Sequence, residues 1–114
     1  MEDSLRLLEA KEWGVVPERA VAASLAEIFA QATGASVYVR SVTAGGGAIW
    51  AMGRRDGARL LLILHRGNAT KAVSHFAGPE RTAHVGEQVL KVRVCPTDHS
   101  NAVRLREAFA FTAP

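Results

Sequence analysis

The sequence contains one cysteine, Cys95, and no apolar run longer than Leu60 to Leu64. A single cysteine cannot form an internal disulfide, which is typical of proteins in the reducing cytoplasm. A bilayer-spanning helix needs about 20 apolar residues, so none is expected. Residues 1–4 are acidic rather than basic and apolar, unlike the start of a secretory signal peptide. We therefore expect a cytoplasmic protein that does not enter a membrane.

Aromatic residues are also scarce, at 6% of the chain, and no basic run exceeds Arg54-Arg55. Both features argue against an ordinary nucleic-acid-binding protein, which relies on basic tracts and stacking side chains. The charge is nevertheless uneven. Residues 1–27 carry six acidic and three basic residues, whereas residues 28–114 carry eleven basic and five acidic ones. This asymmetry is consistent with a surface for nucleic acid or another anionic ligand, and also with a solvated basic sheet face opposite an acidic helical end.

The length of 114 residues and the apolar fraction of 48% predict a single domain over residues 1–114. Residues 17–33 have apolar side chains at helical spacing, followed by Gly34 as a C-terminal cap. Residues 4–13 and the stretch after Thr97 or Asp98 are two further candidate helices. Strands are expected over residues 36–43, 48–53, 58–65 and 89–95.

Turn signals connect the first three expected strands. Gly45-Gly46-Gly47 separates the first two, and Asp56-Gly57 is typical of a tight hairpin between the second and third. The sequence therefore predicts the α+β class. Its sheet would be small and mixed, with about four strands: an antiparallel meander and one crossover strand, packed with two to three helices. The triple glycine lacks the following helix and the lysine-serine pair of a phosphate loop, so we interpret it as a turn.

The histidines and the cysteine show no metal-binding spacing, so neither a metal nor another cofactor is predicted. Three neighbouring residues, Cys95, Asp98 and His99, are weak catalytic candidates. A thiol at the start of a helix has a depressed pKa, and a histidine there can act as a general base. The alternative roles are a buried thiol, a capping aspartate and an exposed histidine.

Arginines form the second group of candidates. Arg54, Arg55 and Arg93 are predicted to bind an anionic ligand on a face of the sheet. With Arg59 and Lys91, and with Tyr38 or Trp50 as stacking residues, they also suggest an alternative function as a small nucleic-acid-binding module.

The last strand and helix carry a family resemblance. The motif Val92-Arg93-Val94-Cys95-Pro96-Thr97-Asp98-His99-Ser100-Asn101-Ala102, then Leu105-Arg106 and residues 109–114, resembles the N-terminal region of the tagaturonate epimerase family. Residues 37–41 and the leucine-rich strand at residues 60–64 are also similar to that region. The resemblance spans roughly residues 37–114.

The resemblance implies carbohydrate metabolism: a metal-dependent isomerase that interconverts tagaturonate and fructuronate. Asp98, His99 and Asn101 match the family pattern, but the catalytic and metal-binding residues of the family lie in a barrel-like body beyond this region. We therefore expect a non-catalytic accessory domain. Its expected partner is a larger catalytic subunit, or a second copy paired through an exposed sheet edge.

Overall fold

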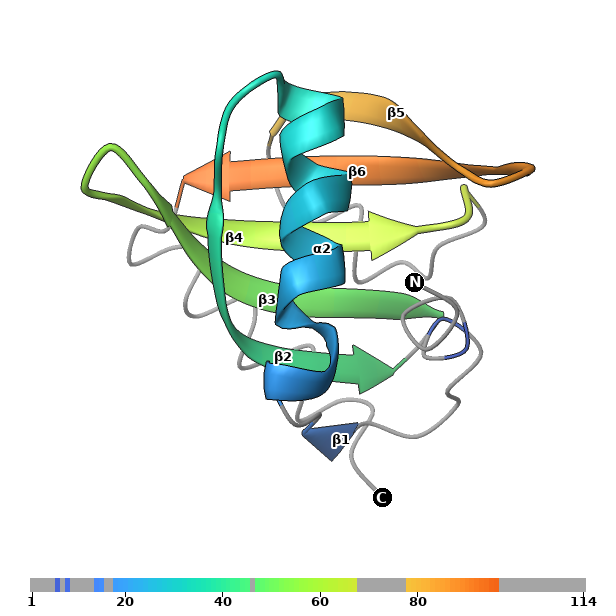
Figure 1. The fold of residues 1–114 in the computed structure, drawn as a ribbon, viewed down its shortest axis with the longest axis horizontal. Helices are drawn as coiled ribbons and strands as arrows, with labels where there is room; N and C mark the ends of the chain where they lie inside the picture. The colour runs from blue at the N-terminus through green and yellow to red at the C-terminus, as the bar shows by residue number, and fades with distance from the viewer. Residues whose placement is uncertain are drawn as a thin grey trace.

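The computed structural model describes residues 6, 8, 14–15, 18–45, 47–67 and 78–96. These residues form one six-stranded sheet with a helix, α2 (Glu18–Thr33), across one face (Figure 1). The strands are β1 (Gly14–Val15), β2 (Tyr38–Gly45), β3 (Ala48–Arg55), β4 (Ala58–His65), β5 (Glu80–Val85) and β6 (Gln88–Pro96). The α+β class is confirmed. Of the helix expected over residues 4–13, only Arg6 and Leu8 are described, and the helix expected after Thr97 lies outside the described residues. No helix in the described part of the chain is long and apolar enough to cross a bilayer.

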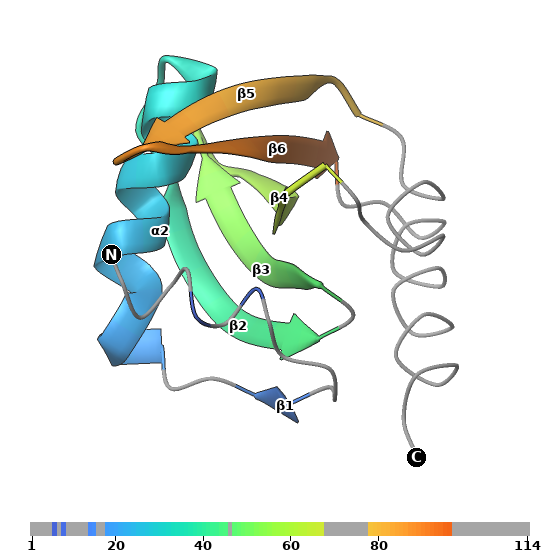
Figure 2. The same ribbon diagram turned by 90° about the vertical axis from the view of Figure 1, so that its right-hand side faces the viewer.

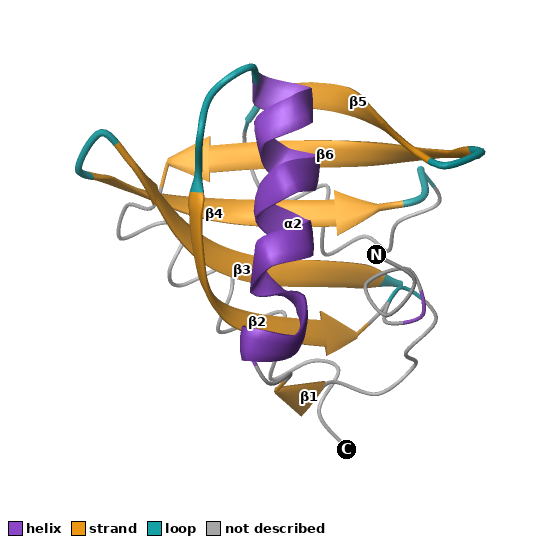
Figure 3. Cartoon of the chain, viewed as in Figure 1, coloured by secondary structure: helices purple, strands orange, loops and turns teal. Residues whose placement is uncertain are grey.

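All strand pairs in the described part of the sheet are antiparallel, in the order β1-β2-β3-β4-β6-β5 (Figure 3). The predicted meander is confirmed as β2-β3-β4. The mixed sheet was a wrong prediction, because β6 lies beside β4 in the antiparallel direction. The predicted number of about four strands was also too low. The sheet includes β1 at one edge and β5 at the other, and neither was expected.

Both unexpected strands have only a weak signal in the sequence, and the reason is physical. β1 has two residues, which pair Gly14 with Ala44 and Val15 with Thr43. β5 is an edge strand that buries only Ala83 and Val85 and exposes its other side chains. An edge strand half exposed to solvent does not need the apolar run of a central strand. Its alternation and the following Gly86, whose φ of 60° suits a tight turn, are the signals that identify it.

The remaining local predictions agree well with the structure. α2 ends as expected, with the Gly34 amide donating to the Ala30 carbonyl at 2.8 Å. Asp56 and Gly57 both have positive φ, 52° and 80°, in the two-residue turn between β3 and β4. This conformation is the reason that Asp-Gly is favoured in tight hairpins.

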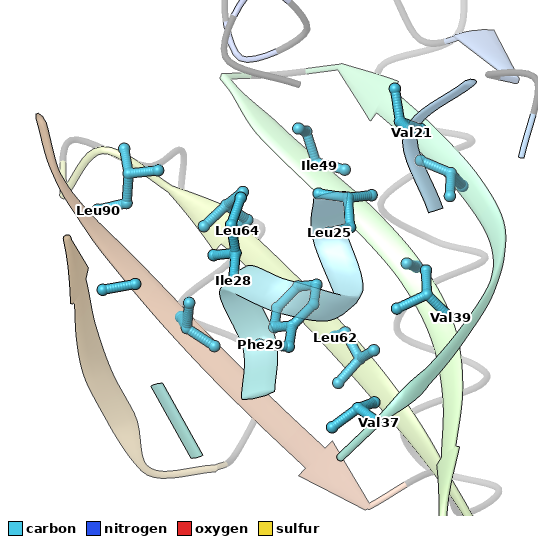
Figure 4. Packing of buried hydrophobic residues seen from close by; sticks show 14 of the residues in the cluster. Val21, Leu25, Ile28, Phe29, Val37, Val39, Ile49, Leu62, Leu64 and Leu90 are labelled. Atoms are coloured by element: carbon cyan, nitrogen blue, oxygen red, sulfur yellow. The ribbon is translucent and has the colours of Figure 1, made fainter. Parts of the chain in front are cut away.

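The main core lies between α2 and the sheet (Figure 2). Helix side chains such as Leu25, Ile28 and Phe29 point toward strand residues such as Leu62 and Leu64 (Figure 4). Leu25, Phe29, Leu62 and Leu64 have no exposed surface. Each such side chain contributes about 1.5–3 kcal/mol through burial. We refer to this side of the sheet as the α2 face.

The other side of the sheet, which we call the opposite face, also buries side chains. Trp50, Leu61, Ile63 and Cys95 are at most 2% exposed, and cross-strand pairing places them in adjacent positions. β4 is therefore apolar on both faces, as its continuous leucine-rich sequence predicts. At one end of the strands, however, the opposite face changes from apolar to basic, and this end holds the candidate site.

Candidate anion-binding site

Three arginines on adjacent strands line one pocket at the end of the opposite face. The pocket is bordered by Arg40 of β2, Met52, Gly53 and Arg54 of β3, and Arg59 of β4. We call it the arginine pocket. Arg54 pairs directly with Arg59, and Arg40 pairs with Met52, so all three guanidinium groups come from neighbouring positions of the ladder. All three side chains are exposed.

This arrangement costs free energy in the absence of a ligand. Like charges at directly paired positions of two strands are destabilising, and Arg54 and Arg59 form such a pair. None of the described residues that line the arginine pocket is acidic. A guanidinium group is a planar fork that binds a carboxylate or a phosphate through two parallel hydrogen bonds. A bound anion would therefore relieve the repulsion and use these donors.

Gly53 brings the backbones of β2 and β3 close together at this pocket. A Cβ atom at residue 53 would lie 2.6 Å from Leu62 Cδ1 and 2.8 Å from the Tyr38 carbonyl oxygen. A side chain on Gly53 would therefore displace β2, which carries Tyr38 and Arg40. Glycine is required here by close packing, since its φ is not positive.

A second polar group, the His65 cluster, consists of His65, Glu80 and Arg93. His65 Nε2 lies 3.1 Å from Glu80 Oε2, and Arg93 Nη2 donates to the same oxygen at 3.0 Å. The Gly67 amide donates to His65 Nδ1 at 3.0 Å, which makes Nδ1 an acceptor and leaves the proton on Nε2. His65 is 3% exposed, so this cluster ties the end of β4 to β5 and β6.

The pKa values within the cluster follow from this geometry. Burial lowers the pKa of His65 below its usual value of 6.5, against the smaller opposing effect of Glu80. Burial acts to raise the pKa of Glu80. The hydrogen bonds from Arg93 and His65, together with the charges of these two residues, exceed that effect, so the pKa is lowered from 4.5. At neutral pH the cluster therefore contains a neutral histidine and an ionised carboxylate held by Arg93.

The arginines that were predicted from the sequence to share a ligand-binding face do not all share one site in the structure. Arg54 lies in the arginine pocket. Its neighbour Arg55 belongs to the α2 face, because successive strand residues point to opposite faces. Arg93 is bound to Glu80, and its side chain is 20% exposed. Lys91 donates to Thr82 Oγ1 at 3.1 Å. Only Arg54 and Arg59 from the predicted set therefore share a site.

Of the three weak catalytic candidates, Cys95 alone lies within the described residues. Cys95 is fully buried, and burial raises the pKa of its thiol to about 11, with Arg93 acting in the opposite direction. A thiolate nucleophile requires a depressed pKa, so the shift is opposite to that expected for a reactive cysteine. Asp98 and His99 lie outside the described residues. The stacking role suggested for Trp50 was wrong, because that side chain is 1% exposed.

Arg40 and Glu80 were not predicted as site residues from the sequence. Arg40 follows Tyr38 by two residues, which indicates a shared face, but its pairing with Met52 depends on strand register. Glu80 follows a turn and lies on a strand that was not predicted. Glu80 contacts His65, which lies 15 residues earlier in the chain, and no sequence pattern predicts this contact.

Within the described residues, no three His, Cys, Asp or Glu side chains gather closely enough to bind a metal ion. Comparison with protein-family models, curated proteins and solved structures finds no match to this chain. The fold and the candidate site therefore define it only as an antiparallel α+β domain with an arginine-lined pocket.

Proposed function

We propose that this chain is a non-catalytic binding domain, accessory to a larger sugar-acid epimerase, and that its arginine pocket receives an acidic group. The observation that carries this proposal is the convergence of Arg40, Arg54 and Arg59 on one exposed pocket. Their mutual repulsion favours binding of an anion, and their planar forks suit a carboxylate.

Three titratable side chains, His65, Glu80 and Cys95, are placed for structural roles rather than for catalysis. A general base must reach the proton that it removes, but His65 is buried and both of its ring nitrogens are engaged. Glu80 is held by His65 and Arg93. The Cys95 thiol is protonated at neutral pH because its pKa is about 11. These groups are suited to stabilising the fold.

The family resemblance of residues 37–114 supplies the sugar-acid context. A uronate presents a carboxylate on a sugar ring, and a larger catalytic subunit presents acidic side chains. Either provides the planar anion that the three guanidinium groups are suited to bind. The epimerase chemistry would belong to the catalytic subunit, and this domain would contribute recognition.

NMR titration of the isotope-labelled chain with galacturonate, and with galactose as the uncharged control, tests this proposal. We expect galacturonate alone to shift the amides of Arg40, Met52, Arg54 and Arg59, with a dissociation constant of roughly 1–10 mM. Arg54→Gln should weaken binding at least several-fold. Arg55→Gln, which removes the same charge from the α2 face, should leave it unchanged.

Two results would contradict the proposal. One is the absence of any shift localised to the arginine pocket. The other is conversion of tagaturonate to fructuronate by the purified chain alone, assayed with added divalent metal ions. Copurification of epimerase activity with the tagged chain from its native cells would support the accessory role.

A further inference from the structure

An exposed tyrosine extends the arginine pocket into a row across three strands. Tyr38 is 64% exposed, although aromatic side chains in a sheet are usually buried. It pairs directly with Arg54, and Arg54 pairs directly with Arg59. The three side chains therefore stand side by side on the opposite face, and Arg40 follows Tyr38 along β2 on that face.

We propose that this row binds single-stranded nucleic acid, with one base stacked on Tyr38 and the adjacent phosphates on Arg40, Arg54 and Arg59. The inference rests on the proposed function, because it requires the arginine pocket to accept anions. The inference differs from the proposed function in its ligand, which combines negative charge with a flat aromatic ring.

The dimensions of the row suit such a ligand. Adjacent strands lie about 4.8 Å apart, so Tyr38 and Arg59 are separated by roughly 10 Å across β2, β3 and β4. This distance accommodates one base and one or two phosphates. Proteins that bind single strands commonly combine a basic surface with an aromatic side chain on which a base stacks. In a duplex the base faces are stacked on their neighbours, so Tyr38 cannot reach them.

The remaining candidates for the same role are engaged elsewhere in the structure. Trp50 is buried, Arg93 contacts Glu80, and Lys91 donates to Thr82. Among these sequence-predicted residues that the structure describes, only the members of the row remain available, together with Arg40. We expect this surface to make two or three phosphate contacts. For a surface of this size we expect weak binding, with a binding constant that depends only slightly on salt concentration.

Fluorescence anisotropy with fluorescein-labelled (dT)8 tests the inference at several salt concentrations. The logarithm of the binding constant should fall with the logarithm of salt concentration with a slope of about −1.4 to −2.1, from about −0.7 per phosphate contact. Tyr38→Ala should weaken binding about tenfold through loss of stacking. Tyr38→Phe should retain binding within about twofold, because the ring remains.

Charge variants separate phosphate contact from general electrostatic attraction. Arg54→Gln should bring the slope closer to zero by about 0.7, whereas Arg55→Gln should leave it unchanged. Circular dichroism of each variant confirms that it is folded.

Several results would overturn the inference. They are equal affinity of Tyr38→Ala and the natural chain for (dT)8, binding of a duplex as tight as that of (dT)8, and binding of thymidine 5′-monophosphate as tight as that of the octamer. If galacturonate still shifts the arginine pocket in those cases, the proposed function survives without this ligand. If neither probe perturbs the pocket, both proposals fail.

Discussion

The burial of His65 shows how one residue can be polar, titratable and structural at once. A buried neutral histidine needs a partner for each ring nitrogen, and His65 has Glu80 on one side and the Gly67 amide on the other. Protonation would place a proton on Nδ1, where the Gly67 amide already points. The cluster therefore favours the neutral form, in agreement with the lowered pKa.

This residue predicts a loss of stability on acidification. Because the pKa of His65 is lower in the folded state than in the unfolded state, the unfolded chain binds more protons below about pH 7. The free energy of unfolding should therefore fall as the pH decreases through 6.5, by at most about 1.4 kcal/mol per pH unit for one proton. Glu80, whose pKa is also lowered, adds a second loss below about pH 4.5.

Urea denaturation between pH 7.5 and 5.5 measures the first of these losses. His65→Gln keeps a side-chain amide close to Glu80 but does not titrate, so its stability should depend less on pH than that of the natural chain. His84→Gln removes an exposed histidine of β5 and should retain the natural dependence. An unchanged dependence in His65→Gln would refute this explanation.

At the scale of elements, the edge strand β5 is protected by a side chain from the helix. The Gln31 side-chain oxygen of α2 accepts a hydrogen bond from the His84 backbone amide at 3.2 Å. An unpaired amide on an edge strand is a site where another chain can add a strand. Gln31 thus opposes pairing of a second copy at the His84 end of β5.

Removal of this bond should loosen the edge locally. We expect Gln31→Ala to accelerate hydrogen exchange at the His84 amide and to lower the free energy of unfolding by about 0.5 kcal/mol, because the bond is exposed to solvent. Glu27→Ala removes an exposed side chain one turn earlier in α2 and serves as the control. Exchange at His84 that is equally slow in both variants would contradict the protective role.

Elements were predictable where sequence period and turn chemistry agree, as in α2, β3 and β4. The register of strand pairing and the face on which each side chain lies were harder to predict from the sequence. The register of β2 shifts between Arg40 and Thr43, so that Val39 and Val42 both lie in the core on the α2 face. Strict alternation would place Val42 on the opposite face. A bulge of this kind adds a residue without a clear sequence signal.

At the scale of the whole molecule, the sheet connects the apolar side chains that are buried on its two faces. Phe29 is buried on the α2 face, and Trp50 is buried on the opposite face. The intervening strands β3 and β4 contribute side chains to both. Small domains with one sheet generally unfold in a single cooperative transition.

We therefore expect Phe29→Ala to destabilise both faces together. The substitution should lower the free energy of unfolding by about 3–4 kcal/mol. Trp50 fluorescence, measured with Trp13→Phe in place, and far-ultraviolet circular dichroism should shift to the same lower urea concentration. Val89→Ala, at a 51% exposed position, should change stability by no more than about 0.5 kcal/mol. A Trp50 transition that stays in place while circular dichroism shifts would show that the faces unfold separately.

The candidate site was only partly predictable because it is a property of the assembled sheet. Arg54 and Arg59 are recognisable as basic residues near a hairpin, and the Asp-Gly turn between them implies that they lie close together. Their alignment with Tyr38 and Arg40 depends on the pairing of β2 with β3. The separation from Arg93 depends on the register of β6, which places Arg93 opposite Ile63, and Arg93 is then bound to Glu80 of the unpredicted strand β5.

The strand order also determines where chain entropy is lost during folding. The β2-β3, β3-β4 and β5-β6 pairs are each joined by a short turn, so each forms at a small loop-closure cost. The β4-β6 ladder instead joins residues far apart in the chain, such as Leu60 with Pro96. Formation of this one ladder combines a three-strand meander with a hairpin, and it carries most of the sheet's non-local contact order. We therefore expect the buried leucines of β4, which provide the apolar surface that the hairpin contacts, to influence the folding rate as well as the stability.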